Sequence, residues 1–306
     1  MLNSPAILAS CLRKEFGQNV AVRGLDLEVK RGEVFGFLGP NGAGKTTSIK
    51  MFLDLVHPTS GSVEILGLAA SDPAARAKIG FLPEHFRFHD WLNANEFLTL
   101  HGELYQIPRR ELAQRIDQLL ELVGLTEFRT KYLKTYSKGM LQRIGLAQAM
   151  LNHPALIFLD EPTSGLDPVG RRLVRDIIRT LRLEGTTVFL NSHLLSEVEI
   201  TCDRVAFIKH GEVLRVCELA NLVDGEISLQ LRVQKLSEPA FQGLAQWGRD
   251  IRKDGDHLQM VIDRDEDLPS IHRFLVQSGA ELFAFTPQRV SLEDLFIQIV
   301  GTDGGL

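Results

Sequence analysis

One short segment of the chain combines residue types that hold phosphate groups. Residues 39–46 read GPNGAGKT, which fits the pattern G-x-x-x-x-G-K-[ST], and they stand between the apolar run VFGFLG and a stretch with helical spacing. Glycines in such a loop let successive backbone N–H groups converge on phosphate oxygens at the positive end of the following helix. Lys45 would add a charge to the β and γ phosphates, and Thr46 would offer its hydroxyl to Mg²⁺. The segment therefore predicts a binding site for a nucleoside triphosphate.

Two consecutive carboxylates follow a second apolar run. Residues 156–161 read LIFLDE, and we expect a buried strand that ends at Asp160. Asp160 would reach Mg²⁺ held by Thr46, usually through water. Glu161, one residue further, would point towards the γ phosphate and could orient and deprotonate an attacking water. A solvated strand end explains the segment equally well on its own, so this interpretation depends on the neighbouring motifs.

Three apolar runs must position these side chains, namely VFGFLG, ALIFLDEP and TTVFLNSH. Each is apolar along its length and becomes polar at its C-terminal end, as a parallel strand buried on both faces does where it reaches an active sheet edge. From Ile7 to about Val216 such runs alternate with longer helical patterns, which is the order of a parallel sheet flanked by helices. We therefore predict an α/β fold with the functional groups at one edge of the sheet.

The length of the chain favours two domains. Residues 1–220 form the first predicted domain, and the helical spacing from about 90 to 151, as in Leu112 and Ile116, predicts a helical insertion there. Residues 221–306 form the second, where ISLQLRV, HLQMVID and ELFAFTP alternate like strands around two helical stretches. The order is roughly β-α-β-β-α-β with a closing helix in SLEDLFIQIV, which predicts a small α+β domain.

Composition excludes several classes of protein. An apolar share of 44% and a charged share of 24% are not those of collagen-like, disordered or disulfide-scaffold chains. A net charge of −5 disfavours a nucleic-acid binder that neutralises phosphates. Three cysteines without a CxxC pair indicate neither a disulfide framework nor a zinc site, so we expect a reducing cytoplasm. We expect no secretory signal in the first residues and no bilayer-spanning helix, so a membrane role would require a partner chain.

Further motifs, in a fixed order, make the chain resemble the ATP-binding-cassette (ABC) family from about residue 7 to residue 216. YSKGM at residues 136–140 resembles the signature loop, and SGLD at residues 164–167 resembles the D-loop. His193 in NSH resembles the switch histidine of the family. The resemblance implies a P-loop NTPase cassette, in which a parallel core sheet carries a helical subdomain. We call residues 39–46 the P-loop from here on.

Two more positions match the family. Phe16 in KEFG stands where an aromatic residue stacks on adenine, and Glu84 in FLPEH falls at the Q-loop. The resemblance implies ATP and Mg²⁺ as cofactors, with Glu161 and His193 as catalytic residues. The expected metal-binding residues are Thr46, Asp160 and Glu84. The expected nucleotide-binding residues are Phe16, Gly39, Pro40, Asn41, Gly42, Ala43, Gly44, Lys45, Thr46, Thr47, Glu84, Ser137 and Gly139.

Ser137 and Gly139 have two interpretations. They precede a helical pattern, so Ser137 could simply cap that helix. In the ABC family this helix end faces the γ phosphate held by the other subunit, which would use anion binding at a helix N-terminus across a dimer interface. The resemblance therefore implies a homodimer that sandwiches two ATP molecules.

Two departures from the commonest family pattern affect the expected site. YSKGM replaces LSGGQ but keeps Ser137 and Gly139, so we expect activity to survive. Glu84 stands where glutamine is usual and follows Pro83. This substitution resembles the branch of the family whose cassettes and permeases are separate chains and which commonly exports drugs, polysaccharides or ions.

The leading interpretation is an ATP-hydrolysing subunit that drives export through a separate integral membrane permease. It would act as a pair with a second copy of itself, peripherally at the cytoplasmic face of the membrane, and we expect no nucleic-acid partner. One alternative is a soluble ABC-type ATPase acting on nucleic acid or ribosomes, but such relatives usually show long coiled coils, zinc modules or two cassettes per chain. The other is a non-transport ATP switch, which the intact Lys45, Asp160, Glu161 and His193 disfavour.

Aromatic residues after the Q-loop provide a candidate partner surface. Phe86, Phe88, Trp91 and Phe97 are close in sequence, where related cassettes receive a helix from the membrane subunit. Ordinary core packing explains such a cluster equally well.

Overall fold

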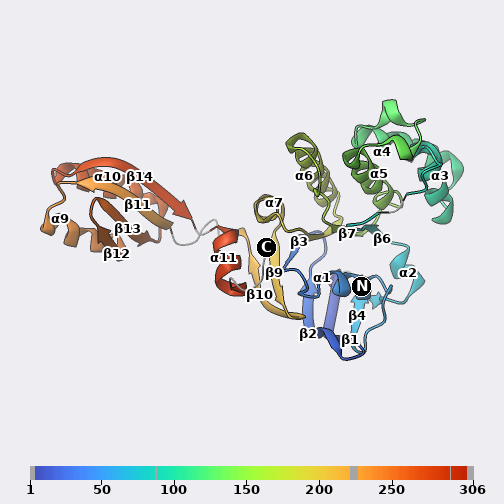
Figure 1. Cartoon of the computed structure of the whole chain (residues 1–306), viewed down its shortest axis with the longest axis horizontal. Helices are drawn as coiled ribbons and strands as arrows, with labels where there is room; N and C mark the ends of the chain where they lie inside the picture. Colours follow the sequence, from blue (N-terminus) through green and yellow to red (C-terminus); the bar gives the residue numbers. More distant parts are fainter. Residues whose placement is uncertain (1–3, 87, 221–226, 290, 302–306) are drawn as a thin grey trace. The chain divides into compact units, whose positions relative to one another are not determined.

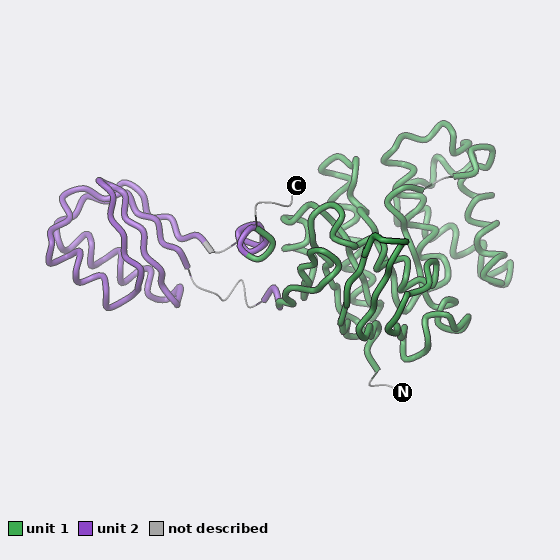
Figure 2. Tube along the Cα trace, turned by 60° about the horizontal axis from the view of Figure 1, so that its bottom comes forward, with its two compact units in different colours: residues 1–217, 299–306 green, residues 218–298 purple. Residues whose placement is uncertain are grey.

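The computed structural model describes residues 4–86, 88–220, 227–289 and 291–301. Contacts divide the chain into two compact units, residues 1–217 with 299–306 and residues 218–298 (Figure 2). The sequence places the boundary between residues 220 and 221, whereas the contacts place it slightly earlier and assign the C-terminal residues to the first unit. Each unit has its own hydrophobic core.

A six-stranded sheet forms the centre of the first unit (Figure 1). Its order is β10-β9-β3-β8-β7-β6, and the neighbouring strands from β9 to β6 run parallel. The strands are β3 (Val34–Leu38), β6 (Ile79–Leu82), β7 (Leu156–Asp160), β8 (Thr187–Asn191), β9 (Arg204–Lys209) and β10 (Glu212–Glu218). All residues of β3, β7 and β8 are buried, which explains their nearly continuous apolar sequences. The predicted parallel sheet is confirmed for these strands.

Phenylalanine rings fill the space between this sheet and α1 (Lys45–Phe52). Phe189 of β8 lies at their centre, with its ring centroid 5.2 Å from that of Phe37 and 5.3 Å from that of Phe158. Phe52 of α1 meets Phe189 edge to face at 5.7 Å. These rings are fully buried, and burial of each side chain stabilises the fold by roughly 1.5–3 kcal/mol. The cluster fixes the strand before the P-loop relative to the strand that ends at Asp160.

A second sheet of the first unit is antiparallel, and the prediction of a parallel sheet flanked by helices over residues 7–216 does not include it. Its order is β2-β1-β4-β5, and each neighbouring pair is antiparallel. The strands are β1 (Ile7–Phe16), β2 (Asn19–Val29), β4 (Ser60–Ile65) and β5 (Leu68–Ala69). Only Gly17 and Gln18 separate β1 from β2, and so short a link joins antiparallel strands, whereas parallel strands need a long crossover.

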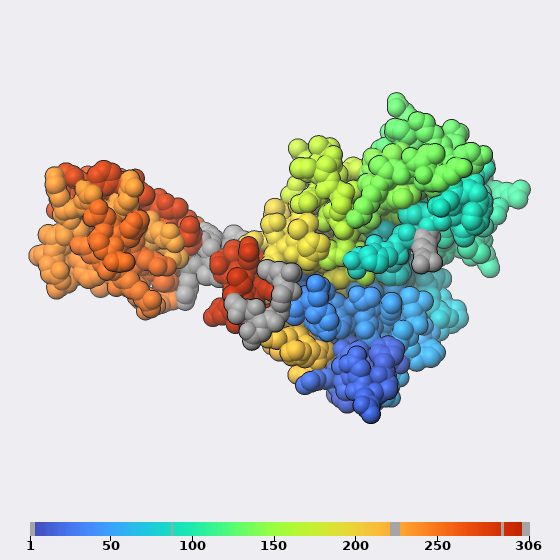
Figure 3. Space-filling view, viewed as in Figure 1, coloured from blue at the N-terminus to red at the C-terminus, as the bar shows by residue number. Residues whose placement is uncertain are grey.

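Helices α3 (Ala94–Leu104), α4 (Arg109–Leu122) and α5 (Lys138–Ala149) lie where the sequence predicts the helical insertion. Leu112, Ile116, Leu119 and Leu120 are buried along one face of α4, as their spacing requires. In the space-filling view, the green insertion and the blue N-terminal strands form opposite ends of the first unit (Figure 3). The unit also contains α2 (Pro73–Arg76), α6 (Pro168–Leu183) and α7 (Leu195–Thr201).

The second unit is a small α+β module. Its antiparallel sheet has the order β12-β13-β11-β14. The elements are β11 (Ile227–Gln234), α9 (Glu238–Gly243), β12 (Gly248–Asp254), β13 (His257–Ile262), α10 (Leu268–Gln277), β14 (Glu281–Arg289) and α11 (Leu292–Val300), whose last two residues belong to the first unit. This is the predicted β-α-β-β-α-β order with a closing helix. Within the described ranges of both units, no helix combines the length and the apolar character that a membrane span needs.

Candidate active site

The P-loop leaves β3 and leads into α1, as the sequence predicts. Gly42 and Gly44 have φ angles of 78° and 99°, a region that favours glycine. A Cβ atom on Gly39 would lie 2.2 Å from the carbonyl oxygen of Ile208, so glycine is needed where the loop passes β9. Helix α1 begins without a side-chain N-cap, in contrast to α6, which Asp167 caps, and α1 has no acidic residue in its first turn. Its first backbone N–H groups therefore suit an anionic ligand.

Lys45 lies among the predicted carboxylates. Its Nζ atom donates hydrogen bonds to two carbonyl oxygens of the P-loop, at 2.6 and 3.0 Å. Burial lowers the pKa of Lys45, and the negative charges of Glu161, Asp160 and Glu84 oppose this shift, in that order. The fold thus brings together four residues from three segments that are far apart in sequence. Phosphate oxygens could accept the hydrogen bonds that Lys45 now donates to its own loop.

Asp160 is buried at the end of β7. It pairs in register with Asn191 of β8, and the Asn191 side-chain amide donates a hydrogen bond to Asp160 Oδ1. Burial raises the pKa of Asp160, and the hydrogen bond from Asn191 opposes that shift. Asn191 is absent from the sequence-predicted set, although its position at a polar strand end, two residues before His193, is a signal that could have found it.

Glu161 and His193 form a direct pair. His193 Nδ1 lies 2.7 Å from Glu161 Oε2. Glu161 has a φ angle of 53°, and its backbone N–H donates to the Asn191 carbonyl oxygen at 2.8 Å. Burial raises the pKa of Glu161, and the neighbouring His193 opposes this shift. The Glu161 side chain is 9% exposed and the His193 side chain 62%, so the histidine is open to a ligand while the carboxylate is shielded.

Gln142 is a further residue at the site that the sequence interpretation lacks. Its Nε2 atom donates a hydrogen bond to the backbone carbonyl oxygen of Glu161 at 3.3 Å. Ser164 of the D-loop donates its backbone N–H to the same oxygen at 3.1 Å. Gln142 lies on α5, so the helical insertion contacts the turn that carries Glu161. No local spacing in the sequence signals this contact.

Ser137 and Gly139 are not part of this cluster. Ser137 is exposed, and its Oγ atom accepts a hydrogen bond from the backbone N–H of Met140, which caps α5. Among the described residues, no hydrogen bond joins Ser137 or Gly139 to the P-loop of the same chain. The signature loop instead approaches its own D-loop, because a Cβ atom on Gly165 would lie 2.7 Å from a side-chain carbon of Lys138.

Phe16, Thr46 and Glu84, which were also predicted, are exposed, whereas Pro40 and Ala43 of the P-loop are buried. Phe16 ends β1 with half of its surface exposed, and the Lys14 ammonium lies 4.9 Å from its ring centre. Thr46 and Glu84 are exposed, and Glu84 acts on the site through its charge. Throughout the described part of the chain, no three or more His, Cys, Asp or Glu side chains are grouped to hold a metal ion by themselves.

The predicted aromatic cluster after the Q-loop consists of three residues rather than four. The ring centroids of Phe86 and Phe88 are 4.3 Å apart, and that of Phe97 lies 6.1 and 5.5 Å from them. Phe97 is buried in the core. Trp91 lies outside this cluster, 69% exposed and 5.0 Å from His89, because α3 begins after it and carries Phe97 inward.

A groove of about 330 Å³ lies beside the cluster. Phe86 and Pro83 contribute to it from the segment after β6, and His101 and Tyr105 from the end of α3. Burial lowers the pKa of His101, which favours its neutral form, and Leu55 on the rim is 62% exposed. The groove is therefore mainly apolar and open to a partner.

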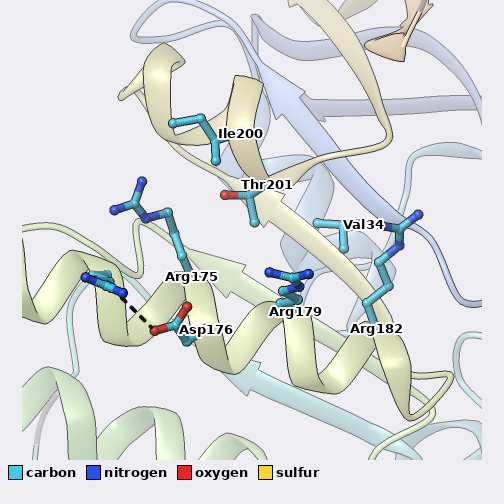
Figure 4. Close-up of a pocket in the computed structure, with 8 residues that line it drawn as sticks. Val34, Arg175, Asp176, Arg179, Arg182, Ile200 and Thr201 are labelled. Atoms are coloured by element: carbon cyan, nitrogen blue, oxygen red, sulfur yellow. Dashed lines mark ion pairs between the residues drawn. The ribbon is translucent and has the colours of Figure 1, made fainter.

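A second groove, of about 410 Å³, lies between α6 and α7 (Figure 4). Arg175, Arg179 and Arg182 project into it from α6. Arg175 lies 3.4 Å from Glu197, and Arg182 lies 2.5 Å from Asp203, so carboxylates neutralise these two arginines. No residue predicted from the sequence to bind nucleotide lines this groove, which separates it from the P-loop site.

Comparison with known proteins identifies the family. The chain matches the family described as ABC transporter over residues 22–164. It is 40% identical over 285 residues to an ABC transporter ATP-binding protein of Synechocystis sp.. This match covers 91% of this chain and 78% of the relative. It is 34% identical over 308 residues to the bacitracin transport ATP-binding protein BcrA of Bacillus licheniformis, with coverage of 97% and 98%.

A solved structure has a similar fold over much of the chain. The dimeric ATP-binding cassette MJ0796, in a post-hydrolysis state bound to ADP and Pi, matches with a TM-score of 0.64 at 27% identity. The match covers 70% of this chain and 98% of that chain. The fold class and the ATPase activity predicted from the sequence are thereby confirmed. The chain belongs to the ABC transporter ATP-binding proteins and is an ATPase subunit of that family.

Proposed function

We propose that Glu161 and His193 hydrolyse Mg-ATP at sites shared by two copies of the chain, and that this reaction drives export through the permease. The observation that carries the proposal is the 2.7 Å contact between His193 Nδ1 and Glu161 Oε2, at the sheet edge where Lys45 and Asp160 also lie. A buried base, a phosphate-binding cation and a metal-binding carboxylate are the parts that phosphoryl transfer to water requires.

The chemistry of the P-loop fits a nucleotide with its metal. The uncapped N-terminus of α1 offers N–H donors to phosphate oxygens, and Lys45 adds its charge. Thr46, Asp160 and Glu84 would hold Mg²⁺, which neutralises phosphate charge when it is bound. The half-exposed ring of Phe16 would stack on adenine. The other proposed contacts are Gly39, Pro40, Asn41, Gly42, Ala43, Gly44 and Thr47.

Glu161 has the properties of a general base. Its burial raises its pKa, which makes the carboxylate a stronger base than a solvated one. In the proposed reaction an Oε atom of Glu161 accepts a proton from the attacking water, while His193 holds the carboxylate in place through the 2.7 Å contact. The exposed remainder of the His193 ring is open to the γ phosphate.

The signature loop is proposed to serve the nucleotide of the second copy. Ser137 and Gly139 are open at the N-terminus of α5 and make no hydrogen bond to their own P-loop within the described residues. The N-terminus of this twelve-residue helix attracts anions. The dimeric solved relative supports a shared arrangement.

The permease is proposed to insert a cytoplasmic helix into the apolar groove beside Phe86, which would place the chain peripherally at the cytoplasmic face of the membrane. The exposed apolar rim and the neutral form of His101 support an apolar partner. Export as the direction is supported by a relative named for bacitracin transport.

Source cells that carry either the wild-type chain or Glu161→Gln test the export proposal. The variant should sensitise cells to at least one compound in an antibiotic panel that includes bacitracin, because export requires turnover. Glu199→Gln, on the exposed surface of α7, is the matched control and should behave as wild type. Equal sensitivity of both strains to the whole panel would contradict drug export.

A further inference from the structure

The P-loop contacts two other segments through backbone hydrogen bonds, namely the turn between β9 and β10 and, through that turn, strand β2. The turn His210–Gly211 between β9 and β10 approaches Ala43 of the loop, and the Gly211 N–H donates a hydrogen bond to the Ala43 carbonyl oxygen at 2.8 Å. Strand β2 completes the contact, because the Arg23 N–H donates to the Gly211 carbonyl oxygen at 3.0 Å. Both backbone polar groups of Gly211 are thus used, one on the P-loop and one on the antiparallel sheet. Backbone hydrogen bonds hold these three segments in a fixed arrangement.

The segments are too close for any side chain at the contact. A Cβ atom on Gly211 would lie 2.5 Å from Val22 Cα and 2.8 Å from the backbone nitrogen of Arg23. A Cβ atom on Gly44 would lie 2.6 Å from the Ala21 carbonyl oxygen. These neighbours are backbone atoms, which cannot rotate away as a side chain can. A substitution at Gly211 must therefore move the turn, the strand or the P-loop.

The position of the P-loop matters because its hydrogen bonds to phosphate oxygens form only over a narrow range of distances. Charge-assisted hydrogen bonds to phosphate oxygens are about 2.7–2.9 Å long, so a displacement of a few tenths of an ångström in several N–H groups weakens them together. Ala43 and Gly44 directly precede α1, whose first N–H groups and Lys45 face the proposed phosphates. Gly211 therefore contacts the loop that is proposed to bind the nucleotide, but not the nucleotide itself.

We infer that the His210–Gly211 turn is a positioning element for nucleotide binding, in which Gly211 sets the place of the P-loop through Ala43 and Gly44. The inference rests on the proposed function, in which the P-loop binds the nucleotide. No motif of the sequence analysis includes Gly211. Its role follows from the two hydrogen bonds and the missing space for a Cβ atom.

The chain offers a matched control for this role. Gly211 has a φ angle of 76°, and Gly185, between α6 and β8, has a φ angle of 85° with nothing within 4 Å of its added Cβ atom. Alanine at either position takes on an unfavourable backbone conformation, but only alanine at Gly211 collides with its surroundings. A general loss of stability would therefore appear in both variants, whereas a displaced P-loop would appear only in Gly211→Ala.

Isothermal titration of the full chain with a poorly hydrolysed ATP analogue and Mg²⁺ tests the inference. Gly211→Ala should raise Kd at least tenfold, while Gly185→Ala stays within twofold of wild type. In steady-state assays Gly211→Ala should raise KM more than it lowers kcat, because the catalytic Glu161 is untouched. Wild-type affinity in folded Gly211→Ala would overturn the positioning role.

Lys45→Ala separates this outcome from failure of the proposed function. If wild type binds the analogue and Lys45→Ala does not, the P-loop is the binding site, and the Gly211→Ala result judges the turn alone. If Lys45→Ala binds as wild type does, the P-loop proposal itself fails.

Amide hydrogen exchange on the wild-type chain tests the inference in the case in which Gly211→Ala does not fold. Addition of the analogue should slow exchange at Gly211 and Arg23 more than at Gly255 in the second unit, and equal changes would overturn the inference.

Discussion

His193 Nδ1 lies 2.7 Å from Glu161 Oε2, although the two residues are 32 positions apart. The contact exists because β7 and β8 are adjacent and parallel, with Asp160 opposite Asn191, so the residues just beyond the two strand ends meet. Glu161 adopts a left-handed backbone conformation that costs a non-glycine residue about 1–3 kcal/mol. The hydrogen bond from its N–H to the Asn191 carbonyl oxygen helps to hold that conformation.

Replacement of the proposed base should separate binding from turnover. Glu161→Gln removes the proton acceptor but keeps the size of the side chain, so we expect Mg-ATP binding near that of wild type and turnover lower by about 10² to 10⁴. An ATP-bound dimer should accumulate on gel filtration, since the two copies no longer separate after ATP hydrolysis. Glu199→Gln is the control, and near-normal turnover of Glu161→Gln would remove Glu161 from the catalytic role.

A mixed dimer tests whether the two copies share their sites. Ser137→Arg should block hydrolysis because a bulky cation at the start of α5 prevents closure on the other copy, and Lys45→Ala should abolish tight binding at its own P-loop. In a dimer of one variant with the other, one site carries both lesions and the other neither. Partial ATPase activity should therefore return when the two inactive proteins are mixed. Absence of rescue in dimers shown to be mixed would contradict shared sites.

Glu84 departs from the usual glutamine and should matter for coupling more than for chemistry. Its charge raises the pKa of Asp160 and Glu161, but the proposed catalytic pair does not include it. We expect Glu84→Gln to keep basal ATPase activity within about tenfold, which is roughly 1.4 kcal/mol in barrier. The ratio of permease-stimulated to basal activity should change more, because the charge of Glu84 acts on Asp160 and Glu84 stands in sequence between Pro83 and Phe86, which line the groove. An unchanged ratio with intact transport would exclude a coupling role, and a collapse of basal activity would place Glu84 with the catalytic residues.

Asp160 should make the stability of the nucleotide-free chain depend on pH. Burial raises the pKa of Asp160 above its ordinary value of 3.8, so folding favours the protonated carboxyl. The stability from this preference is present at low pH and is lost as the pH rises through the raised pKa. Asp160→Asn keeps an acceptor for Asn191 without the charge, so its Tm should exceed that of wild type at pH 7.5.

The advantage of Asp160→Asn should shrink as the pH is lowered towards 4, because the wild-type carboxyl then becomes neutral as well. Thermal unfolding of both proteins without nucleotide or metal over this pH range measures the difference. Asp176→Asn, at an exposed position on α6, should show no such trend. A constant Tm difference between Asp160→Asn and wild type at every pH would contradict the assigned protonation behaviour.

The sequence by itself determined those features whose residues are neighbours along the chain. The P-loop is contiguous, and its glycines and Lys45 precede a helix, so its chemistry was predictable from spacing. Strands β3, β7 and β8 were predictable because burial on both faces requires nearly unbroken apolar runs. The order of elements in the second unit follows from the alternation of two-residue and helical periods.

The tertiary structure decided which of these elements are adjacent. Strand β8 lies between β3 and β7, which brings His193 to Glu161, and Gln142 reaches the same turn from α5. The tertiary structure also decided three further features. These are the antiparallel N-terminal sheet, the position of Trp91 outside the aromatic cluster and the contact of Gly211 with Ala43. Each depends on sheet order, register or close backbone packing between distant segments. Local spacing sets which face a residue occupies within its own element, and only the packed chain sets what lies opposite that face.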